Sequence, residues 1–427
     1  MHAGALSEWQ TLRRVLVHPP GIEVFFALLA PSAHLYERFF NHAEARWEHH
    51  QLCELLRSNG VRVETLTDVI LNAAAENDEV RNRLIAMAQE RMGRRCTGGE
   101  ICLPRRLEAE RLTPIHLPER DNEHLLRVAL LDPTLSITKK GVRVILDRPL
   151  HNLYFMRDQQ IATDRGMVTG KMATPERAFE VEFSRLSLDA LGTSPVHRIT
   201  RGTLEGGDFI PAGEFALVGC GLRTDRSGIR DLLTGGCSYP EIAVVHQPAH
   251  PLVPERDPMI AMHLDTFVNF AADGIAIASP VLLEESRVEV FRRKNNEYVP
   301  FGLQGNLAGY LAEKGFETIA ITTLEQLCYA SNFLCVRNGV CITPDTAQLA
   351  PAVLHRLQEK AAADPARYSA LLAQAEHDYQ LLRADAEFFP HKKAVYANGL
   401  EMTPVLMVNA TGGYGGAHCM TCPILRD

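Results

Sequence analysis

A cysteine lies in a glycine-rich stretch within the last sixteen residues of the chain, which read GGYGGAHCMTCPILRD from Gly412 to Asp427. A thiolate is a strong nucleophile, so Cys419 beside His418 is a candidate for covalent catalysis. The glycines would let the backbone adopt positive φ and pass close to a bound molecule; they are Gly412, Gly413, Gly415 and Gly416. The alternative is a buried free cysteine near a loosely ordered terminus, and the other polar motifs must decide between the two.

Cys419 also forms a C-x-x-C pair with Cys422, which allows a zinc or a redox interpretation. A zinc knuckle needs a second pair at similar spacing, and the chain has no other C-x-x-C. A redox motif normally opens a helix, whereas Pro423 follows immediately here. Ten cysteines without a regular framework favour thiols used for packing, metal binding or catalysis over disulfides.

A second motif places two carboxylates on either side of a Gly-Gly turn, at Glu205 and Asp208. Two anions cannot neutralise each other, so this motif requires a cation: an internal arginine, a metal or a cationic ligand. Turn chemistry alone would explain the glycines but not both acids.

Two further motifs bring charge into apolar surroundings. If Met262 to Thr266 is a strand, His263 and Asp265 share one face and address one cavity, as a catalytic base or a metal ligand would. The segment from Asn152 to Asp158 ends in Arg157-Asp158, for which a buried structural ion pair is the plain alternative to a functional role.

The combined inventory is a thiol, an imidazole and at least three carboxylates. A metal site is conceivable, but His263 and Asp265 are the only close ligand pair. An organic cation such as guanidinium explains the acids better, because carboxylates bind it through paired hydrogen bonds and leave its central carbon exposed on one face. A thiolate on that face can attack the carbon.

Alternating strand and helix patterns must position these residues. Residues 12–18 and 61–66 are predicted strands on either side of a helical region at 31–59, and this β, α, β order indicates an α/β fold. Strands are predicted at 142–146, 161–163, 167–169, 216–219, 242–245, 267–270, 275–277, 318–322 and 340–343. Helices are predicted at 175–191, 227–234, 303–314 and 351–386, and a helical insertion at 68–132, broken between 94 and 118.

The whole chain has 427 residues and a formal net charge of −8, so it lacks the excess of basic residues typical of proteins that bind nucleic acid or a membrane surface. The first residues lack a signal-peptide pattern, and no apolar run is long enough to span a bilayer. We therefore expect a cytoplasmic protein that acts on a small molecule, with no nucleic-acid or membrane partner.

Taken in order, the motifs resemble those of the guanidino-modifying enzymes, and within them the arginine deiminases. The resemblance spans essentially the whole chain. It comprises the opening strand that ends in His18-Pro19, F-x-R-D at Phe155 to Asp158, E-G-G-D at Glu205 to Asp208, H-L-D-T at His263 to Thr266 and H-C-M-T-C-P at His418 to Pro423. Each motif is weak alone, and the four polar motifs in this order are specific.

The resemblance implies a five-bladed, pseudo-symmetric α/β propeller of ββαβ modules, with a helical bundle inserted after the first blade. The chain would be a single catalytic domain over 1–427, with the insertion at 68–132. The catalytic roles implied are Cys419 as nucleophile, His263 as general acid and base, Asp158 and Asp265 as ligands of the guanidinium, and Glu205 beside His263.

The resemblance further implies substrate-binding positions, among which arginines and an asparagine bind the substrate carboxylate and its surroundings. They are Asn152, Phe155, Arg177, Arg223, Gly416 and His418. One position departs from the family pattern: Tyr414 stands five residues before the cysteine, where arginine deiminases commonly have an arginine.

The implied reaction is hydrolysis of L-arginine to L-citrulline and ammonia through an S-alkylthiouronium on Cys419, with no metal and no organic cofactor. An amidinotransferase would intercept the same intermediate with an amine. The motifs also leave open a deiminase of another guanidino compound such as agmatine, and a silent homologue that only binds a ligand. We also expect a homo-oligomer.

Overall fold

Five sheets in the part of the chain that the structure describes repeat one pattern, in which a central strand pairs antiparallel with one neighbour and parallel with the other. The structure is a computed structural model that describes residues 3–96, 117–138, 141–146, 148–253 and 255–427. In sheet order the strands are β20 (Cys422–Arg426), β1 (Leu12–Val17) and β2 (Arg62–Thr65); β6 (Gln160–Thr163), β7 (Gly166–Thr169) and β8 (His197–Arg198); β9 (Phe209–Pro211), β10 (Phe215–Cys220) and β11 (Glu241–His246); β12 (Val268–Ala272), β13 (Ile275–Ala278) and β16 (Glu317–Ala320); β17 (Leu334–Arg337), β18 (Val340–Pro344) and β19 (Glu401–Val405).

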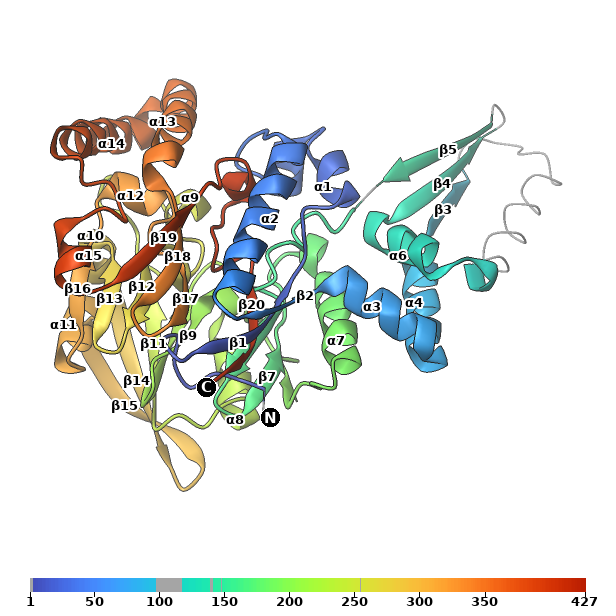
Figure 1. Ribbon diagram of the computed structural model, residues 1–427, viewed down its shortest axis with the longest axis horizontal. Helices are drawn as coiled ribbons and strands as arrows, with labels where there is room; N and C mark the ends of the chain where they lie inside the picture. Colours follow the sequence, from blue (N-terminus) through green and yellow to red (C-terminus); the bar gives the residue numbers. More distant parts are fainter. Residues whose placement is uncertain (1–2, 97–116, 139–140, 147, 254) are drawn as a thin grey trace.

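Helices connect the two parallel strands of each sheet, as a parallel pair requires a crossover. These connecting helices are α1 (Ile22–Ala27) and α2 (His42–Ser58) between β1 and β2, α7 (Glu180–Ala190) between β7 and β8, α8 (Arg226–Gly235) between β10 and β11, α10 (Pro280–Glu285) and α11 (Leu307–Glu313) between β13 and β16, and α13 (Thr346–Ala363), α14 (Pro365–Asp385) and α15 (Lys393–Ala397) between β18 and β19. The chain is therefore a mixed α/β protein, as the β, α, β order predicted. Its last strand, β20, pairs with its first, β1 (Figure 1).

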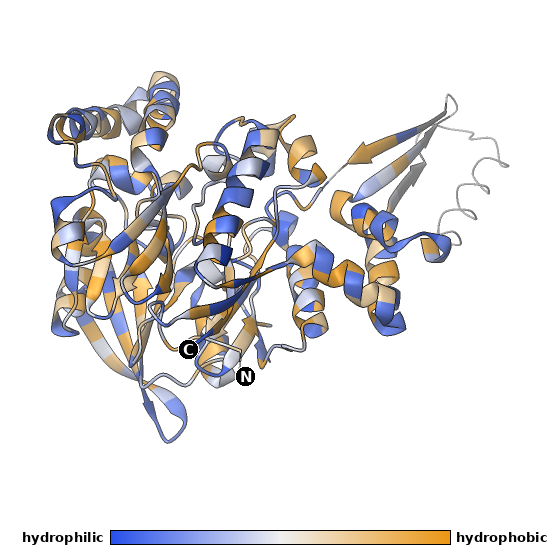
Figure 2. Cartoon of the chain, viewed as in Figure 1, coloured by the Kyte–Doolittle hydropathy of each residue, from blue (hydrophilic) through white to orange (hydrophobic). Residues whose placement is uncertain are grey.

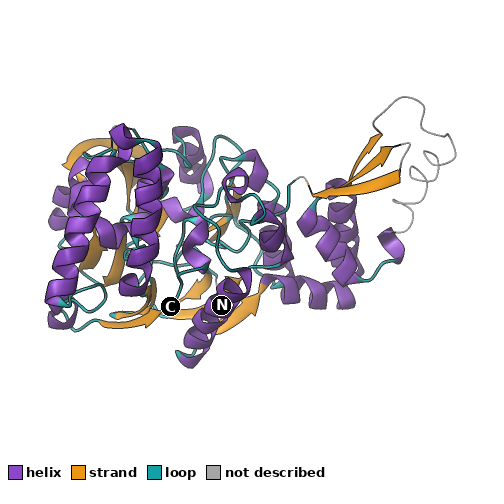
Figure 3. Ribbon diagram, turned by 90° about the horizontal axis from the view of Figure 1, so that it is seen from above, coloured by secondary structure: helices purple, strands orange, loops and turns teal. Residues whose placement is uncertain are grey.

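The insertion stands out from this body in two views (Figures 1 and 3). Its helices are α3 (Leu66–Glu76), α4 (Asp78–Arg91) and α6 (Asn122–Leu131), and its sheet has β3 (Gly93–Cys96), β4 (Pro133–Thr138) and β5 (Gly141–Leu146). The insertion predicted at 68–132 is not purely helical, because it also contains strand β3, which pairs with β4. Most of the broken stretch predicted at 94–118 lies outside the described residues.

Buried apolar residues from strands and helices form a common core, and in Figure 2 hydrophobic residues are seen on both kinds of element. Strand β11 is buried almost throughout, which matches its run of Ile242, Ala243, Val244 and Val245. Trp9 packs edge-on against Phe270, with ring centroids 5.9 Å apart, and so joins the N-terminal segment to the sheet of β12. None of the described helices is long and apolar enough to cross a membrane.

Several predicted elements differ from the structure. The helix expected at 351–386 is two helices, because Pro365 lacks the N–H that would continue the first and begins α14 instead. Residues 303–306 belong to strand β15 (Glu297–Asn306), whose hairpin with β14 (Arg287–Lys294) extends the third sheet. Residues 262–266 are not a strand: they follow α9 (Pro258–Ala261) and form a 3₁₀ turn at Leu264–Thr266.

Candidate active site

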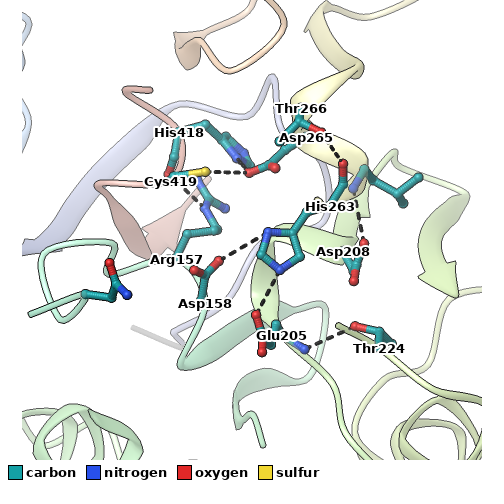
Figure 4. Close-up of polar contacts among 12 residues, drawn as sticks. Arg157, Asp158, Glu205, Asp208, Thr224, His263, Asp265, Thr266, His418 and Cys419 are labelled. Atoms are coloured by element: carbon teal, nitrogen blue, oxygen red, sulfur yellow. Dashed lines mark hydrogen bonds and ion pairs between the residues drawn. The ribbon is translucent and has the colours of Figure 1, made fainter. Parts of the chain in front are cut away.

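The candidate site residues lie in the short segments that precede the first strand of each repeated sheet. Asp158 precedes β6, Glu205 precedes β9, Asp265 precedes β12, Asn332 precedes β17 and Cys419 precedes β20. Because all five sheets have the same topology, these segments occupy the same position in each unit. Hydrogen bonds and ion pairs link residues of these segments to one another. Figure 4 shows the contacts that involve His263, Asp265 and Cys419.

The Cys419 thiol is buried and has two polar contacts in the described structure. Its Sγ lies 3.4 Å from Asp265 Oδ2 and accepts a hydrogen bond from Asn332 Nδ2 at 3.1 Å. Burial, reinforced by the charges of Asp265 and Asp158, raises the pKa of Cys419 well above its ordinary value, while the Asn332 hydrogen bond opposes the shift. The resting thiol is therefore protonated near neutral pH.

The His263 imidazole lies between two carboxylates. Its Nε2 is 2.9 Å from Glu205 Oε2, and its Nδ1 is 3.8 Å from Asp158 Oδ1 (Figure 4). Burial alone would lower the pKa of His263, but the charge of Asp158 and the hydrogen bond to Glu205 raise it to about 10. Burial likewise works to raise the pKa of Glu205, and His263 outweighs it, so that this pKa falls to about 2.

Of the two acids in the Gly-Gly motif, Glu205 is the one that pairs with the His263 imidazolium. Asp208 instead accepts a hydrogen bond from the backbone N–H of Leu264 at 3.1 Å, and burial raises its pKa to about 6. The two acids of the motif therefore have different partners: Glu205 orients the imidazole, and Asp208 holds the backbone beside it.

Asp265 connects the thiol to a buried histidine. Its Oδ2 is 2.8 Å from His418 Nδ1, and His418 Nε2 lies 3.4 Å from Glu8 Oε1. Burial would raise the pKa of Asp265, but the hydrogen bond with His418 lowers it, so this carboxylate is ionised. His418 contacts Asp265, and it does not line the cavity described below.

The pair suggested by Arg157-Asp158 does not form. Arg157 donates to Glu8 Oε1 at 3.3 Å and to the backbone carbonyl of His418 at 3.2 Å. Asp158 Oδ2 instead accepts a hydrogen bond from Arg177 Nη1 at 2.7 Å. Neighbours in sequence thus have different partners, each from another part of the chain.

Arg177 and Arg223 differ in their surroundings, although the sequence predicts similar roles. Arg177 is buried and binds both Asp158 and Glu180, with Nη2 2.9 Å from Glu180 Oε2. Burial works to lower the pKa of Arg177, and these two carboxylates raise it instead. Within the described ranges the guanidinium of Arg223 forms no hydrogen bond or ion pair, yet it lines the cavity.

A narrow cavity of about 20 Å³ connects these groups. It is lined by Leu35, Asn152, Phe155, Asp158, Arg177, Arg223, Met262, His263, Gly413, Tyr414 and Cys419. The cavity contains the predicted nucleophile, the predicted acid and base, and both predicted arginines. Tyr414 lines it from the glycine-rich loop, the position where the family pattern has arginine.

Two carboxylate oxygens beside Cys419 accept no hydrogen bond from the described residues. They are Asp158 Oδ1 and Asp265 Oδ1, and both are fully buried. Asn152 Oδ1 is a third buried acceptor without a partner there. Buried acceptors are usually satisfied, so these three unsatisfied oxygens favour a ligand that donates hydrogen bonds.

The glycines near Cys419 serve close packing rather than positive φ. None of the four glycines in this loop has φ in the left-handed region, and Tyr414, at φ 75°, has it instead. A Cβ on Gly415 would lie 2.7 Å from the Phe155 ring, and one on Gly416 would lie 2.9 Å from the Asn332 carbonyl oxygen. The prediction of positive φ is therefore wrong, while the need for a close approach holds.

One group of side chains could geometrically hold a metal ion among the described residues. Ligand atoms of Asp158, Glu205 and His263 all lie within 4.8 Å of one another. The Arg177 guanidinium already lies 2.7 Å from Asp158 and 4.0 Å from Glu205, so a fixed cation neutralises this group.

Comparison with known proteins agrees with this geometry. The family model described as arginine deiminase matches residues 33–426. Arginine deiminases of Halobacterium salinarum and Mycobacterium avium are 23% and 25% identical over 99% of this chain, and the matches cover 96% and 98% of those proteins. A solved dimethylarginine dimethylaminohydrolase, an adduct with S-methyl-L-thiocitrulline, shares the fold with TM-score 0.51 at 14% identity and covers 97% of this chain and 100% of its own. The chain belongs to the arginine deiminase family.

Proposed function

We propose that this protein is an arginine deiminase, which hydrolyses L-arginine to L-citrulline and ammonia through a covalent intermediate on Cys419. The observation that carries the proposal is a pair of buried carboxylate oxygens, Asp158 Oδ1 and Asp265 Oδ1, that accept no hydrogen bond from the described residues, in a site with a buried thiol. A guanidinium supplies hydrogen-bond donors in one plane and a positive charge, which these two oxygens require. Family membership supports the same reaction.

In this mechanism the bound guanidinium activates its own nucleophile. Burial, and after it the charges of Asp265 and Asp158, oppose a thiolate and raise the pKa of free Cys419. The positive charge of the substrate offsets both carboxylates, so the thiol proton leaves to solvent as the substrate binds. The thiolate then attacks the central carbon of the guanidinium.

His263 acts first as an acid and then as a base. Because Glu205 and Asp158 keep it protonated, it gives its proton to the departing nitrogen as the carbon–nitrogen bond breaks and ammonia leaves. The neutral imidazole then takes a proton from water, and the resulting hydroxide attacks the S-alkylthiouronium carbon. The tetrahedral intermediate loses its hydroxyl proton to solvent as the carbon–sulfur bond breaks, which releases citrulline and restores the thiolate.

Arg223 is the candidate for the substrate carboxylate, because its guanidinium lines the cavity without a partner among the described residues. Asn152 contributes the free acceptor Oδ1, and Phe155 contributes apolar surface against the alkyl chain. Arg177, which the sequence places in the same role, neutralises Asp158 and Glu180 in the resting site. We propose that Arg177 orients these two carboxylates, in addition to any contact with the substrate.

A second candidate is a deiminase of another guanidino compound, and Tyr414 is the observation that favours it. This side chain lines the cavity and offers a hydroxyl where the family pattern has a cation. An uncharged lining residue weakens the preference for a substrate carboxylate. An amidinotransferase would differ only in the second step, where an amine instead of water attacks the S-alkylthiouronium.

We further propose that the five repeated sheets form a five-bladed α/β propeller within one catalytic domain that carries the insertion at 68–132. The repeated strand pattern and the convergence of equivalent segments support it.

We also propose a homo-oligomer, because Phe25, Leu29 and Phe39 are 45%, 74% and 70% exposed on one stretch of chain. Light scattering after gel filtration would measure the molar mass.

The experiment that tests the function is a mass-resolved product assay with L-arginine, with and without added amines such as glycine, and in parallel with agmatine. We expect citrulline and ammonia from arginine alone. Product only in the presence of an amine would indicate an amidinotransferase, and turnover of agmatine but not arginine would indicate the second candidate.

The matched variant is Cys419→Ser, which we expect to lose turnover by at least about 10³-fold, because a serine hydroxyl is a far weaker nucleophile here. Circular dichroism and thermal melting should match the parent. Retained turnover in this variant would remove the covalent mechanism.

A further inference from the structure

Asn332, which neither the motifs nor the family resemblance singles out, makes four hydrogen bonds at the centre of the site. Its Nδ2 donates to Cys419 Sγ at 3.1 Å and to the backbone carbonyl of Asp265 at 3.2 Å. Its Oδ1 accepts from the backbone N–H of Gly416 at 2.9 Å and of Cys419 at 3.1 Å. The side chain is fully buried, and these contacts use its full hydrogen-bonding capacity.

The orientation of this amide follows from its partners. Backbone N–H groups of Gly416 and Cys419 can only donate, so the atom facing them must be the oxygen. The nitrogen is thereby directed at the sulfur and at a carbonyl, both of which accept. Asn332 therefore keeps a donor on Sγ whether the sulfur is a thiol or a thiolate.

We infer that Asn332 is a catalytic residue, which stabilises the Cys419 thiolate and fixes its position relative to the Asp265 segment. The inference deepens the proposed function and rests on it. Asp265 and Asp158 present negative charge to the sulfur, and the Asn332 amide is its only hydrogen-bond donor in the described structure.

A neutral donor suits this position. A lysine or arginine on the sulfur would compete with the substrate guanidinium for Asp158 and Asp265, whereas an amide stabilises the thiolate without occupying the cation site. The same amide also links the backbone of the glycine-rich loop to that of the Asp265 segment. One side chain thus fixes the position of Cys419 relative to Asp265.

The test uses two substitutions and one matched control. Asn332→Ala removes all four contacts. Asn332→Asp keeps an acceptor for both N–H groups but replaces the donor on Sγ with a carboxylate oxygen. Asn269→Ala is the control, because Asn269 is another buried asparagine, which donates to the carbonyl of Phe333 at 2.9 Å and does not contact the sulfur.

The first readout needs no substrate: the rate of Cys419 alkylation by iodoacetamide as a function of pH, followed by peptide mass spectrometry. Loss of a hydrogen bond to an ionised group should shift the thiol titration upward by about one to two pH units, so alkylation at neutral pH should slow by roughly 10- to 100-fold in both Asn332 variants. The control should stay within about twofold of the parent.

The second readout is steady-state kinetics with L-arginine, where we expect kcat to fall by about 10²-fold with KM changed by less than about threefold. Parental alkylation rates in a folded Asn332→Ala or Asn332→Asp protein would overturn the inference and leave Asn332 a structural residue. If the parent itself does not deiminate arginine, the proposed function fails while the alkylation result still decides the role of Asn332.

Discussion

The two arginines in the cavity show how the surroundings of a residue, rather than its type, decide its role. Arg177 has two carboxylate partners within 3.0 Å, whereas Arg223 has no ion-pair partner within the described parts of the chain. An arginine already paired with acids is a poor ligand for another carboxylate. Arg223 is free to bind one.

Arg223→Ala should therefore raise KM for L-arginine by roughly 10- to 100-fold, the effect of a lost charged hydrogen bond. Agmatine lacks the carboxylate, so its kinetics should change by less than about threefold. Arg226→Ala is the matched control, since Arg226 is exposed and pairs with Glu289 outside the cavity. Equal losses with both substrates would contradict the carboxylate role of Arg223.

The His263–Glu205 pair predicts a pH-dependent stability. The pKa of His263 is raised from 6.5 to about 10, so its contribution is complete below pH 6.5 and is lost as the pH rises through about 10. Glu205→Gln removes one anion and lowers this pKa. The difference in free energy of unfolding between parent and variant should therefore shrink between pH 6.5 and about 10.

Urea denaturation at several pH values across that window would measure this difference. Glu214→Gln is the control, because Glu214 is exposed and belongs to the next hairpin. The lowered pKa of Glu205 itself matters only in acid, where its contribution is lost as the pH falls through about 2. A difference that is constant or that grows with pH would mean that His263 is not the protonated partner.

At the scale of elements, helix α2 holds the loop that leads to Cys419. The buried Glu48 accepts hydrogen bonds from the backbone N–H groups of Asn409 at 2.9 Å and Ala410 at 2.7 Å. The loop after α1 adds a backbone bond, from Glu37 N–H to the Gly412 carbonyl at 2.9 Å. The helical connection between β1 and β2 thus positions the segment that precedes β20.

Glu48→Ala should lower the free energy of unfolding by about 2–4 kcal/mol, because it leaves buried backbone N–H groups without an acceptor. It should also speed amide exchange in residues 409–416. Glu44→Ala is the control: Glu44 is exposed on the same helix, and its carboxylate accepts a hydrogen bond from the Asn409 side-chain amide at 2.9 Å rather than from the backbone. Similar stability losses in both variants would show that helix α2 matters only through its packing.

At the scale of the molecule, one buried ionic cluster joins the N-terminal segment to the last strand. Glu8 lies 2.9 Å from Arg426 Nη2, 3.3 Å from Arg157 Nη1 and 3.4 Å from His418 Nε2. All four side chains are buried, and their positions span the chain from residue 8 to residue 426. This cluster is connected to the active site through His418, which contacts Asp265 and whose backbone carbonyl accepts a hydrogen bond from Arg157.

Glu8→Ala should destabilise the protein by about 3–5 kcal/mol, since it leaves two buried arginines without their anion. Asp427→Ala removes an ion pair near the same strand, between Arg13 and Asp427, whose side chains are 54% and 52% exposed. That control should cost less than about 1 kcal/mol. Chemical denaturation would compare them, and equal losses would contradict the importance of the buried cluster.

The sequence by itself determined the α/β class and the chemistry of the site. Strand and helix periods are local, so the alternation could be predicted without the tertiary fold. The four polar motifs could be recognised for the same reason: their residues are adjacent, and the structure brings Asp158, Glu205, His263, Asp265 and Cys419 together.

Only the tertiary structure decided which groups are partners. Arg157 and Asp158 are neighbours in sequence, yet one binds Glu8 and the other Arg177. Asn332 carries no motif and contacts Cys419 from 87 residues away. No strand was predicted over 334–337, so only the structure shows that Asn332 lies just before a strand, as the other site residues do. Such contacts depend on how the repeated sheets bring segments that are distant in sequence to one point. A local sequence pattern contains no information about which distant segments meet.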